Sequence, residues 1–181
     1  MKLLIISDIH GDFECAKAAI EIFKKEKCDK LVILGDILYH GPRNDLPPAY
    51  APKSVINLLN GYKEQILAVR GNCDTEVDQM VLEFPIMADY AIMYVDGLTI
   101  FATHGHKFNR QTTPPLCDGD ILLYGHTHVL KCEKFGNNNI YINPGSISIP
   151  KENNPKTYLI YEEKTFTVKD FDGNVIINKE F

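Results

Sequence analysis

The sequence predicts an α/β fold, a four-layer α-β-β-α sandwich of two packed mixed sheets with flanking helices. Three observations lead to it. Short buried strands alternate with amphipathic helical segments in the first half of the chain, the second half is rich in strands, and no repeat or linker interrupts the pattern. With 181 residues, of which 45% are hydrophobic, the chain is long enough for one well-buried core, and we expect a single domain over residues 1–181.

The first elements follow from their apolar spacing. Residues 3–7 form a short apolar run that predicts a buried strand. Asp12 can cap the amphipathic helix predicted over residues 13–27, and residues 31–34 predict a second buried strand. This strand–helix–strand order predicts a parallel crossover connection.

A proline-rich segment interrupts the pattern at residues 39–52, which hold four of the ten prolines and predict an ordered loop. Residues 54–60 predict a short helix ended by Gly61, and residues 65–69 predict a third strand.

Strands dominate the rest of the chain. Asp96-Gly97 and Asp172-Gly173 are typical hairpin turns. Strands are predicted over residues 90–95, 98–103, 121–124, 140–142, 157–161, 166–168 and 175–177.

Charge and composition exclude several classes of protein. The net charge of −5 argues against a surface that grips long nucleic acid. The N-terminal apolar run is too short for a signal peptide, and no stretch is long enough for a membrane span. The five cysteines are odd in number and contain no C-x-x-C pair, which favours free thiols and a cytoplasmic location.

Polar side chains follow the predicted strands at the point where each strand ends. Taken singly, each of these segments is an ordinary turn or loop, but five of the six histidines lie in them, and the sixth, His40, comes four residues after Asp36. Because ligands bind at the carboxyl ends of strands in α/β sheets, five such segments in order indicate one shared site. The segments are Asp8-Ile9-His10, Gly35-Asp36, Gly71-Asn72-Cys73-Asp74, Thr103-His104-Gly105-His106 and Gly125-His126-Thr127-His128.

These five motifs, in this order, resemble the calcineurin-like metallophosphoesterases, and most closely the small bacterial and archaeal phosphodiesterases of the YfcE type. The resemblance runs from Asp8 to the segment at residues 142–146. It implies a phosphodiesterase that uses two divalent metals and a metal-bridging hydroxide. It also implies that one metal is held by Asp8, His10 and His128, the other by Asn72, His104 and His126, and that Asp36 bridges both.

The ligand types support this assignment independently of the family. Carboxylate, amide oxygen and imidazole suit manganese, nickel, zinc, iron or cobalt, and we expect manganese. Four imidazoles argue against an all-oxygen magnesium or calcium site.

The sequence departs from the family pattern at Cys73, where most relatives carry a histidine thought to protonate or stabilise the leaving group. In one interpretation Cys73 is a partial substitute, assisted by Asp74 or His40. In the other, which we favour slightly, no residue acts as general acid and the enzyme prefers esters with good leaving groups, since a thiol is a weak donor.

Arg43, Asn44 and His106 are the candidate substrate-binding residues. We expect a small phosphodiester substrate, no stable nucleic-acid complex and no membrane association, and we leave a homo-oligomer open. Two alternatives remain. One is a phosphomonoesterase or nuclease with the same site. The other is a non-catalytic scaffold like the retromer subunit of this superfamily, which retention of all seven ligands disfavours.

Overall fold

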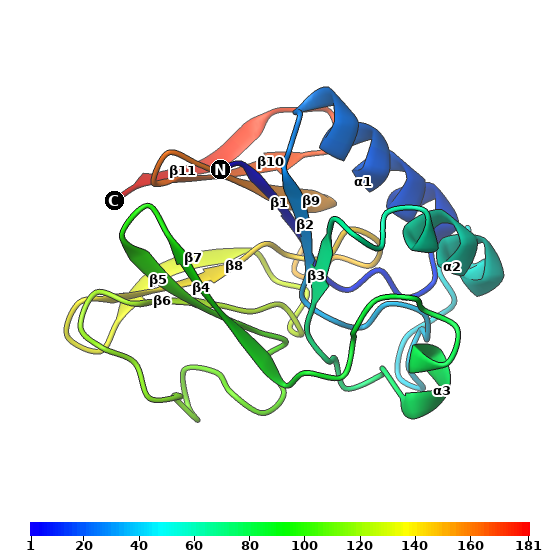
Figure 1. Cartoon of the computed structure of the whole chain (residues 1–181), viewed down its shortest axis with the longest axis horizontal. Helices are drawn as coiled ribbons and strands as arrows, with labels where there is room; N and C mark the ends of the chain where they lie inside the picture. Colours follow the sequence, from blue (N-terminus) through cyan, green and yellow to red (C-terminus); the bar gives the residue numbers. More distant parts are fainter.

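The N-terminal apolar run forms a central strand of a six-stranded mixed sheet in the computed structural model, which describes residues 1–181 (Figure 1). The sheet has the order β11-β10-β9-β1-β2-β3. Its parallel strands are β1 (Leu3–Ile6), β2 (Lys30–Ile33) and β3 (Ile66–Ala68). Its antiparallel strands come from the end of the chain and are β9 (Thr157–Glu162), β10 (Thr165–Asp170) and β11 (Val175–Glu180).

The middle of the chain forms a second, five-stranded sheet with the order β4-β5-β6-β8-β7. Asp96 and Gly97 both adopt positive φ and connect the first two strands, as the hairpin prediction required. The strands are β4 (Tyr90–Val95), β5 (Leu98–Thr103), β6 (Ile121–Leu123), β7 (Lys131–Phe135) and β8 (Asn139–Asn143). Strands β5, β6 and β8 run parallel, so their carboxyl ends share one edge.

Two of the three helices match the predicted ones. Helix α1 (Phe13–Lys25) begins after Asp12, whose carboxylate accepts a hydrogen bond from the Cys15 main-chain N–H at 3.0 Å. Helix α2 (Pro52–Asn60) begins two residues before the predicted start, because proline is well suited to the first helical position. The short α3 (Glu76–Gln79) was not predicted.

Three apolar clusters define the layers. In β1, Leu4 and Ile6 face the helices while Leu3 and Ile5 face the second sheet, so this strand is buried on both sides. The third cluster covers the outer face of the five-stranded sheet, where Phe108 and Leu116 of the loop at 104–120 pack on Phe101 and Tyr124. The two packed mixed sheets and flanking helices are confirmed, with this loop as the outer cover of the second sheet.

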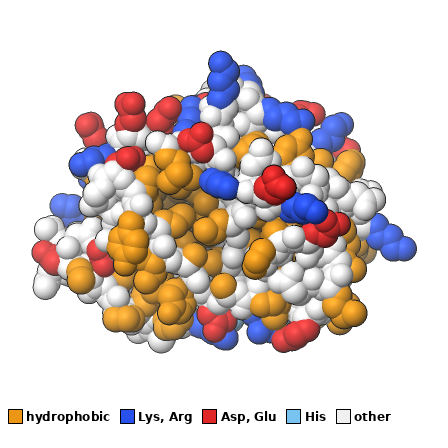
Figure 2. Space-filling model, viewed as in Figure 1, with side chains coloured by type: hydrophobic (Ala, Val, Ile, Leu, Met, Phe, Trp, Pro, Cys, Tyr) orange, Lys and Arg blue, Asp and Glu red, His pale blue; other side chains and the backbone are white.

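The edge strand β4 carries three exposed apolar side chains, Tyr90, Ile92 and Tyr94. Figure 2 shows hydrophobic side chains gathered over this strand and between the two sheets. No helix has the length and apolar character that crossing a membrane requires.

Candidate metal centre

The seven predicted metal ligands lie together at one edge of the sandwich, each just beyond the end of a strand. Asp8 and His10 follow β1, Asp36 follows β2 and Asn72 follows β3. His104 follows β5, and His126 and His128 follow β6. The structure therefore brings together residues from both sheets, separated by up to 120 positions in the sequence.

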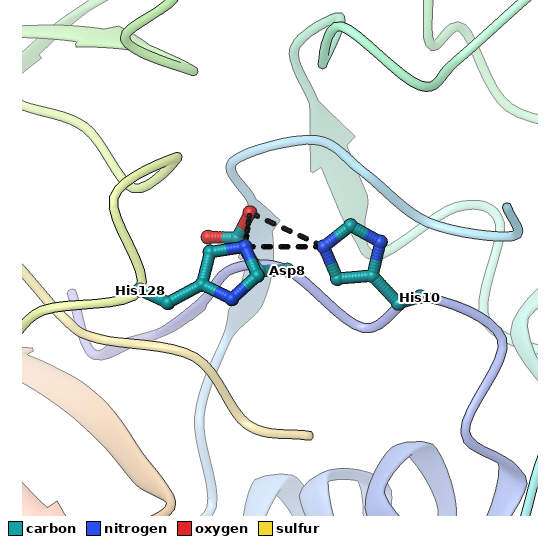
Figure 3. A group of neighbouring side chains, drawn as sticks. All are labelled: Asp8, His10 and His128. Carbon is teal, nitrogen blue, oxygen red and sulfur yellow. Dashed lines mark hydrogen bonds and ion pairs between the residues drawn. The ribbon is translucent and has the colours of Figure 1, made fainter. Parts of the chain in front are cut away.

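One group of converging atoms comprises Asp8, His10 and His128 (Figure 3). The Asp8 Oδ1 atom lies 3.2 Å from His128 Nε2 and 3.7 Å from His10 Nε2. The two Nε2 atoms are 3.2 Å apart. Asp8 Oδ1 is buried and has no hydrogen-bond partner. A buried carboxylate oxygen without a partner is costly, so this arrangement calls for a ligand.

The tautomers of three histidines follow from main-chain carbonyl groups. The Nδ1 atoms of His10, His104 and His128 lie 2.8, 2.6 and 2.8 Å from the carbonyl oxygens of Tyr39, Leu34 and Ile149. A carbonyl oxygen only accepts, so each Nδ1 carries the hydrogen and a neutral ring presents a lone pair at Nε2. Two facing lone pairs 3.2 Å apart repel each other unless a cation lies between them. The residues present therefore fit a metal ion.

A second group surrounds His104. Its Nε2 atom lies 3.0 Å from Asn72 Oδ1, 3.1 Å from His126 Nδ1 and 3.4 Å from Asp36 Oδ2. Asp36 Oδ2 is also 3.7 Å from His10 Nε2, so this carboxylate stands between the two groups. This position suits a carboxylate that contacts two metal ions.

The electrostatics of the protein without metal point the same way. Burial alone would raise the pKa values of Asp8 and Asp36, but the neighbouring histidines lower both. Burial alone would lower the pKa of His104, yet Asp36 and Asp8 outweigh it and raise the pKa to about 9. The two carboxylates thus stabilise positive charge here, which a proton or a metal cation can supply.

The backbone is strained where these ligands lie. Five of the seven adopt left-handed φ angles, a conformation that costs free energy in non-glycine residues and clusters at functional sites. They are Asp8 (57°), His10 (49°), Asp36 (55°), His126 (63°) and His128 (59°).

The glycines of the motifs allow the ligand loops to approach one another. A Cβ atom on Gly71 would lie 2.1 Å from Asp36 Oδ1, and one on Gly125 would lie 1.9 Å from Ser7 Oγ. No larger residue fits at either position, which is the physical reason for glycine before Asn72 and His126.

Asp74 holds the main chain around Asp36. Its carboxylate is buried and accepts hydrogen bonds from the N–H groups of Asp36, Ile37 and Gly71 at 2.8, 2.8 and 2.7 Å. Both oxygen atoms are engaged, so this environment favours a positioning residue over the catalytic role that we considered from sequence.

The segment at residues 142–146 supports the other ligand loops. Ser146 and Ser148 both donate hydrogen bonds to the main-chain oxygen of Asp8, at 2.9 and 2.8 Å. Asn143 donates to the main-chain oxygen of Gly125 at 2.8 Å.

A cavity of about 330 Å³ opens beside the two groups of ligands. Its lining includes the predicted substrate residues Arg43 and Asn44, together with Cys73 and Lys151. Lys151 was not predicted from sequence. The one clue in the sequence was its position shortly after the segment at residues 142–146. In the structure the Lys151 main-chain N–H group donates a hydrogen bond to the His128 carbonyl group at 3.0 Å.

His40 and His106 do not line this cavity. The His40 ring packs against Tyr39 and Tyr50, with centroid separations of 4.7 and 5.5 Å. His106 lines a neighbouring cavity together with Arg110. Burial and the nearby His104 lower the pKa of His106 to about 4, so its ring is neutral at pH 7.

Cys73 is part of the site. Its Sγ atom lies within 4.8 Å of the ligand atoms of His10 and Asp36, and it accepts a hydrogen bond from the Asn72 side chain at 3.2 Å. Burial and the Asp36 carboxylate raise the pKa of the thiol far above its ordinary value. Cys73 is therefore protonated at neutral pH in the protein without metal.

The chain is similar to known phosphoesterases along nearly its whole length. The chain is 44% identical to phosphodiesterase YfcE of Escherichia coli over 177 residues, which cover 98% of this chain and 96% of that protein. A solved structure of YfcE, described as a phosphoesterase from E. coli, superposes with a TM-score of 0.96, covering 99% of this chain and 98% of that chain at 43% identity.

More distant relatives share parts of this similarity. A phosphodiesterase of Methanocaldococcus jannaschii is 29% identical over 80% of this chain and 83% of its own. Vps29 of Entamoeba histolytica shares the fold alone. It is 18% identical and superposes with a TM-score of 0.62, covering 100% of this chain and 99% of its own. The model of the calcineurin-like phosphoesterase superfamily domain matches residues 1–165, and the chain therefore belongs to the calcineurin-like phosphoesterase superfamily.

Proposed function

We propose that this chain is a metal-dependent phosphodiesterase with two divalent metal ions at the seven ligands described above. One observation carries the proposal. Potential ligand atoms converge in two adjacent groups, around Asp8 Oδ1 and around His104 Nε2, and Asp36 lies between them. The 44% identity to phosphodiesterase YfcE supports hydrolysis of a diester.

The proposed ligands are Asp8, His10 and His128 for one ion and Asn72, His104 and His126 for the other, with Asp36 shared. When bound, two such ions supply Lewis-acid stabilisation of the phosphoryl oxygens and a hydroxide nucleophile at neutral pH. Mixed nitrogen and oxygen donors suit manganese, with nickel, zinc, iron and cobalt as alternatives.

The other residues of the cavity attract and orient the substrate. Arg43 and Lys151 bring positive charge to the cavity. This charge attracts the phosphate group into a protein whose net charge is −5. The Asn44 amide donates a hydrogen bond to the His40 carbonyl group at 2.8 Å, which fixes this side chain as part of the cavity wall.

The leaving group receives little help from the protein. A thiol whose pKa is raised by burial and by Asp36 gives up its proton poorly, and the Asp74 oxygens are already occupied. This combination favours diesters with good leaving groups over alkyl diesters.

Metal content and a substrate panel test the proposal together. Protein purified with Mn should contain two ions per chain and hydrolyse aryl diesters faster than monoesters with Mn, Ni or Zn, and poorly with Mg. His128→Asn should lose metal and activity, while the matched variant His40→Asn, outside the cavity, should keep both. Faster turnover of monoesters would instead favour a phosphomonoesterase, and cleavage of DNA a nuclease. Metal-free protein of full activity would contradict the proposal.

We also expect the protein to act in the cytoplasm on a small diester. All five cysteines are free, as in proteins of a reducing compartment. Localisation of the tagged protein by cell fractionation tests this expectation.

A further inference from the structure

An apolar groove adjoins the cavity beside the metal ligands, here called the metal-side cavity, and Cys73 lines both. This apolar groove has a volume of about 380 Å³. Its walls come from both ends of the proline-rich loop, the start of α2 and the segment around α3. Helices α2 and α3 can be located in Figure 1. Its apolar lining comprises Leu38, Tyr39, Tyr50, Pro52, Ile56, Val77 and Val81.

The lining of the groove is mainly apolar and carries no net charge. Its two charged lining residues, Lys53 and Asp78, have opposite signs. The Asp78 carboxylate is already engaged, because it accepts hydrogen bonds from the Thr75 N–H and hydroxyl groups at 2.8 and 2.9 Å. The groove therefore offers mainly apolar contact area, with the Lys53 ammonium group as its one charge free of a partner.

Its rim is nevertheless open to solvent. Tyr39, Val77 and Val81 are 41%, 68% and 43% exposed. One side of the rim is joined directly to a metal ligand, because the Tyr39 carbonyl group accepts the hydrogen bond from His10 Nδ1. Open apolar side chains that begin at the wall of a reaction cavity are typical of a subsite for part of a substrate.

A further cavity beside the metal site is more polar. It shares His126 and Thr127 with the metal-side cavity, and its lining includes Asn109, Arg110 and Lys131. A phosphodiester carries two substituents, so the two flanks of the site present different surfaces to them.

We propose that the groove beside Cys73 is a subsite for an uncharged aromatic or alkyl substituent of the diester, and that it selects asymmetric diesters with one apolar group. This inference rests on the proposed phosphodiesterase function. Val77 and Val81 are its specificity-determining residues.

Two inhibitors that differ only in apolar substituents test the groove. Diphenyl phosphate and dimethyl phosphate carry the same charge and both have poor leaving groups. Competitive inhibition constants against bis(p-nitrophenyl) phosphate, and calorimetric binding to the Mn-loaded protein, should favour diphenyl phosphate by at least about tenfold, since a phenyl ring buries much more apolar area than a methyl group.

Paired variants separate this groove from other apolar surfaces. Val77→Asn together with Val81→Asn should remove most of the preference while binding of dimethyl phosphate stays within about twofold. Met80→Asn is the matched control, because Met80 is 83% exposed in the same segment but does not line the groove. Far-ultraviolet circular dichroism and metal content verify that each variant is folded and loaded.

The outcomes distinguish the two proposals. If the wild type hydrolyses bis(p-nitrophenyl) phosphate but does not discriminate between the inhibitors, or if the double variant keeps the preference, the groove inference is wrong and the phosphodiesterase proposal stands. If the Mn-loaded wild type neither hydrolyses this diester nor binds diphenyl phosphate, both are wrong.

Discussion

Replacing Asp74 with asparagine should lower the free energy of unfolding of the metal-free protein by about 3 kcal/mol. The Asp74 carboxylate accepts three main-chain hydrogen bonds, from Asp36, Ile37 and Gly71. An amide can keep the two bonds to one oxygen at reduced strength. It would also place an N–H group against the Ile37 N–H, so that one buried donor loses its partner at a cost of roughly 1–3 kcal/mol.

Urea unfolding at pH 7 measures this change, and Asp78→Asn is the matched control. The Asp78 carboxylate accepts only the exposed capping hydrogen bonds of Thr75, so replacing it should lower the free energy of unfolding by about 1 kcal/mol or less. Because Asp74 holds the main chain at Asp36, Asp74→Asn should also weaken Mn binding. Unchanged stability and metal content, combined with a selective loss of turnover for diesters with poor leaving groups, would refute this reasoning and identify Asp74 as a general acid.

Three further predictions concern the cavity and its charges. Cys73→Ala should leave turnover of an activated aryl diester within about threefold of wild type, because the thiol is a poor acid, and a loss of a hundredfold or more would overturn this view. Lys151→Ala should raise the KM for a diester about tenfold with little change in kcat; a fall in kcat alone would contradict a binding role. In metal-free protein the pKa of His104 is raised from 6.5 to about 9, so its stabilising contribution is complete below pH 6.5 and disappears as the pH rises towards 9. Urea unfolding at pH 6.5 and 9 should show this loss in wild type and less of it in His104→Asn; equal losses would exclude His104 as the cause.

Local patterns predicted much of the fold. The strand at Leu3–Ile6 and the helix at Phe13–Lys25 agree with the apolar spacing to within one or two residues. Strand β7 was missed because three of its five residues are charged and two of these are adjacent, so this edge strand has neither a buried apolar run nor a regular apolar–polar alternation. The turn between β9 and β10 could not be recognised from sequence, because Glu163 and Lys164 adopt positive φ there in place of the usual glycine or asparagine.

Sheet membership could not be predicted because it depends on pairing between distant segments. Nothing local indicates that β9 returns to pair with β1, which places the end of the chain in the N-terminal sheet. Local patterns also do not show which apolar side chains of connecting segments are buried: Phe84 is buried in the core, whereas Tyr50 lines the apolar groove.

For the site, the types of ligand could be proposed from sequence because each follows a strand end. What surrounds them could not. The hydrogen bonds from His10 and His128 to the Tyr39 and Ile149 carbonyl groups depend on loop conformation, as does the approach of Lys151 to the cavity. Loop conformations of this kind arise from tertiary packing and leave no local pattern.

Anomalous scattering from a crystal of the Mn-loaded protein tests the central claim most directly. We expect two peaks per chain, roughly 3.5–4 Å apart, with Asp36 contacting both. One should lie against Asp8, His10 and His128, and the other against Asn72, His104 and His126. A single peak, or two peaks that do not share Asp36, would contradict the two-metal account.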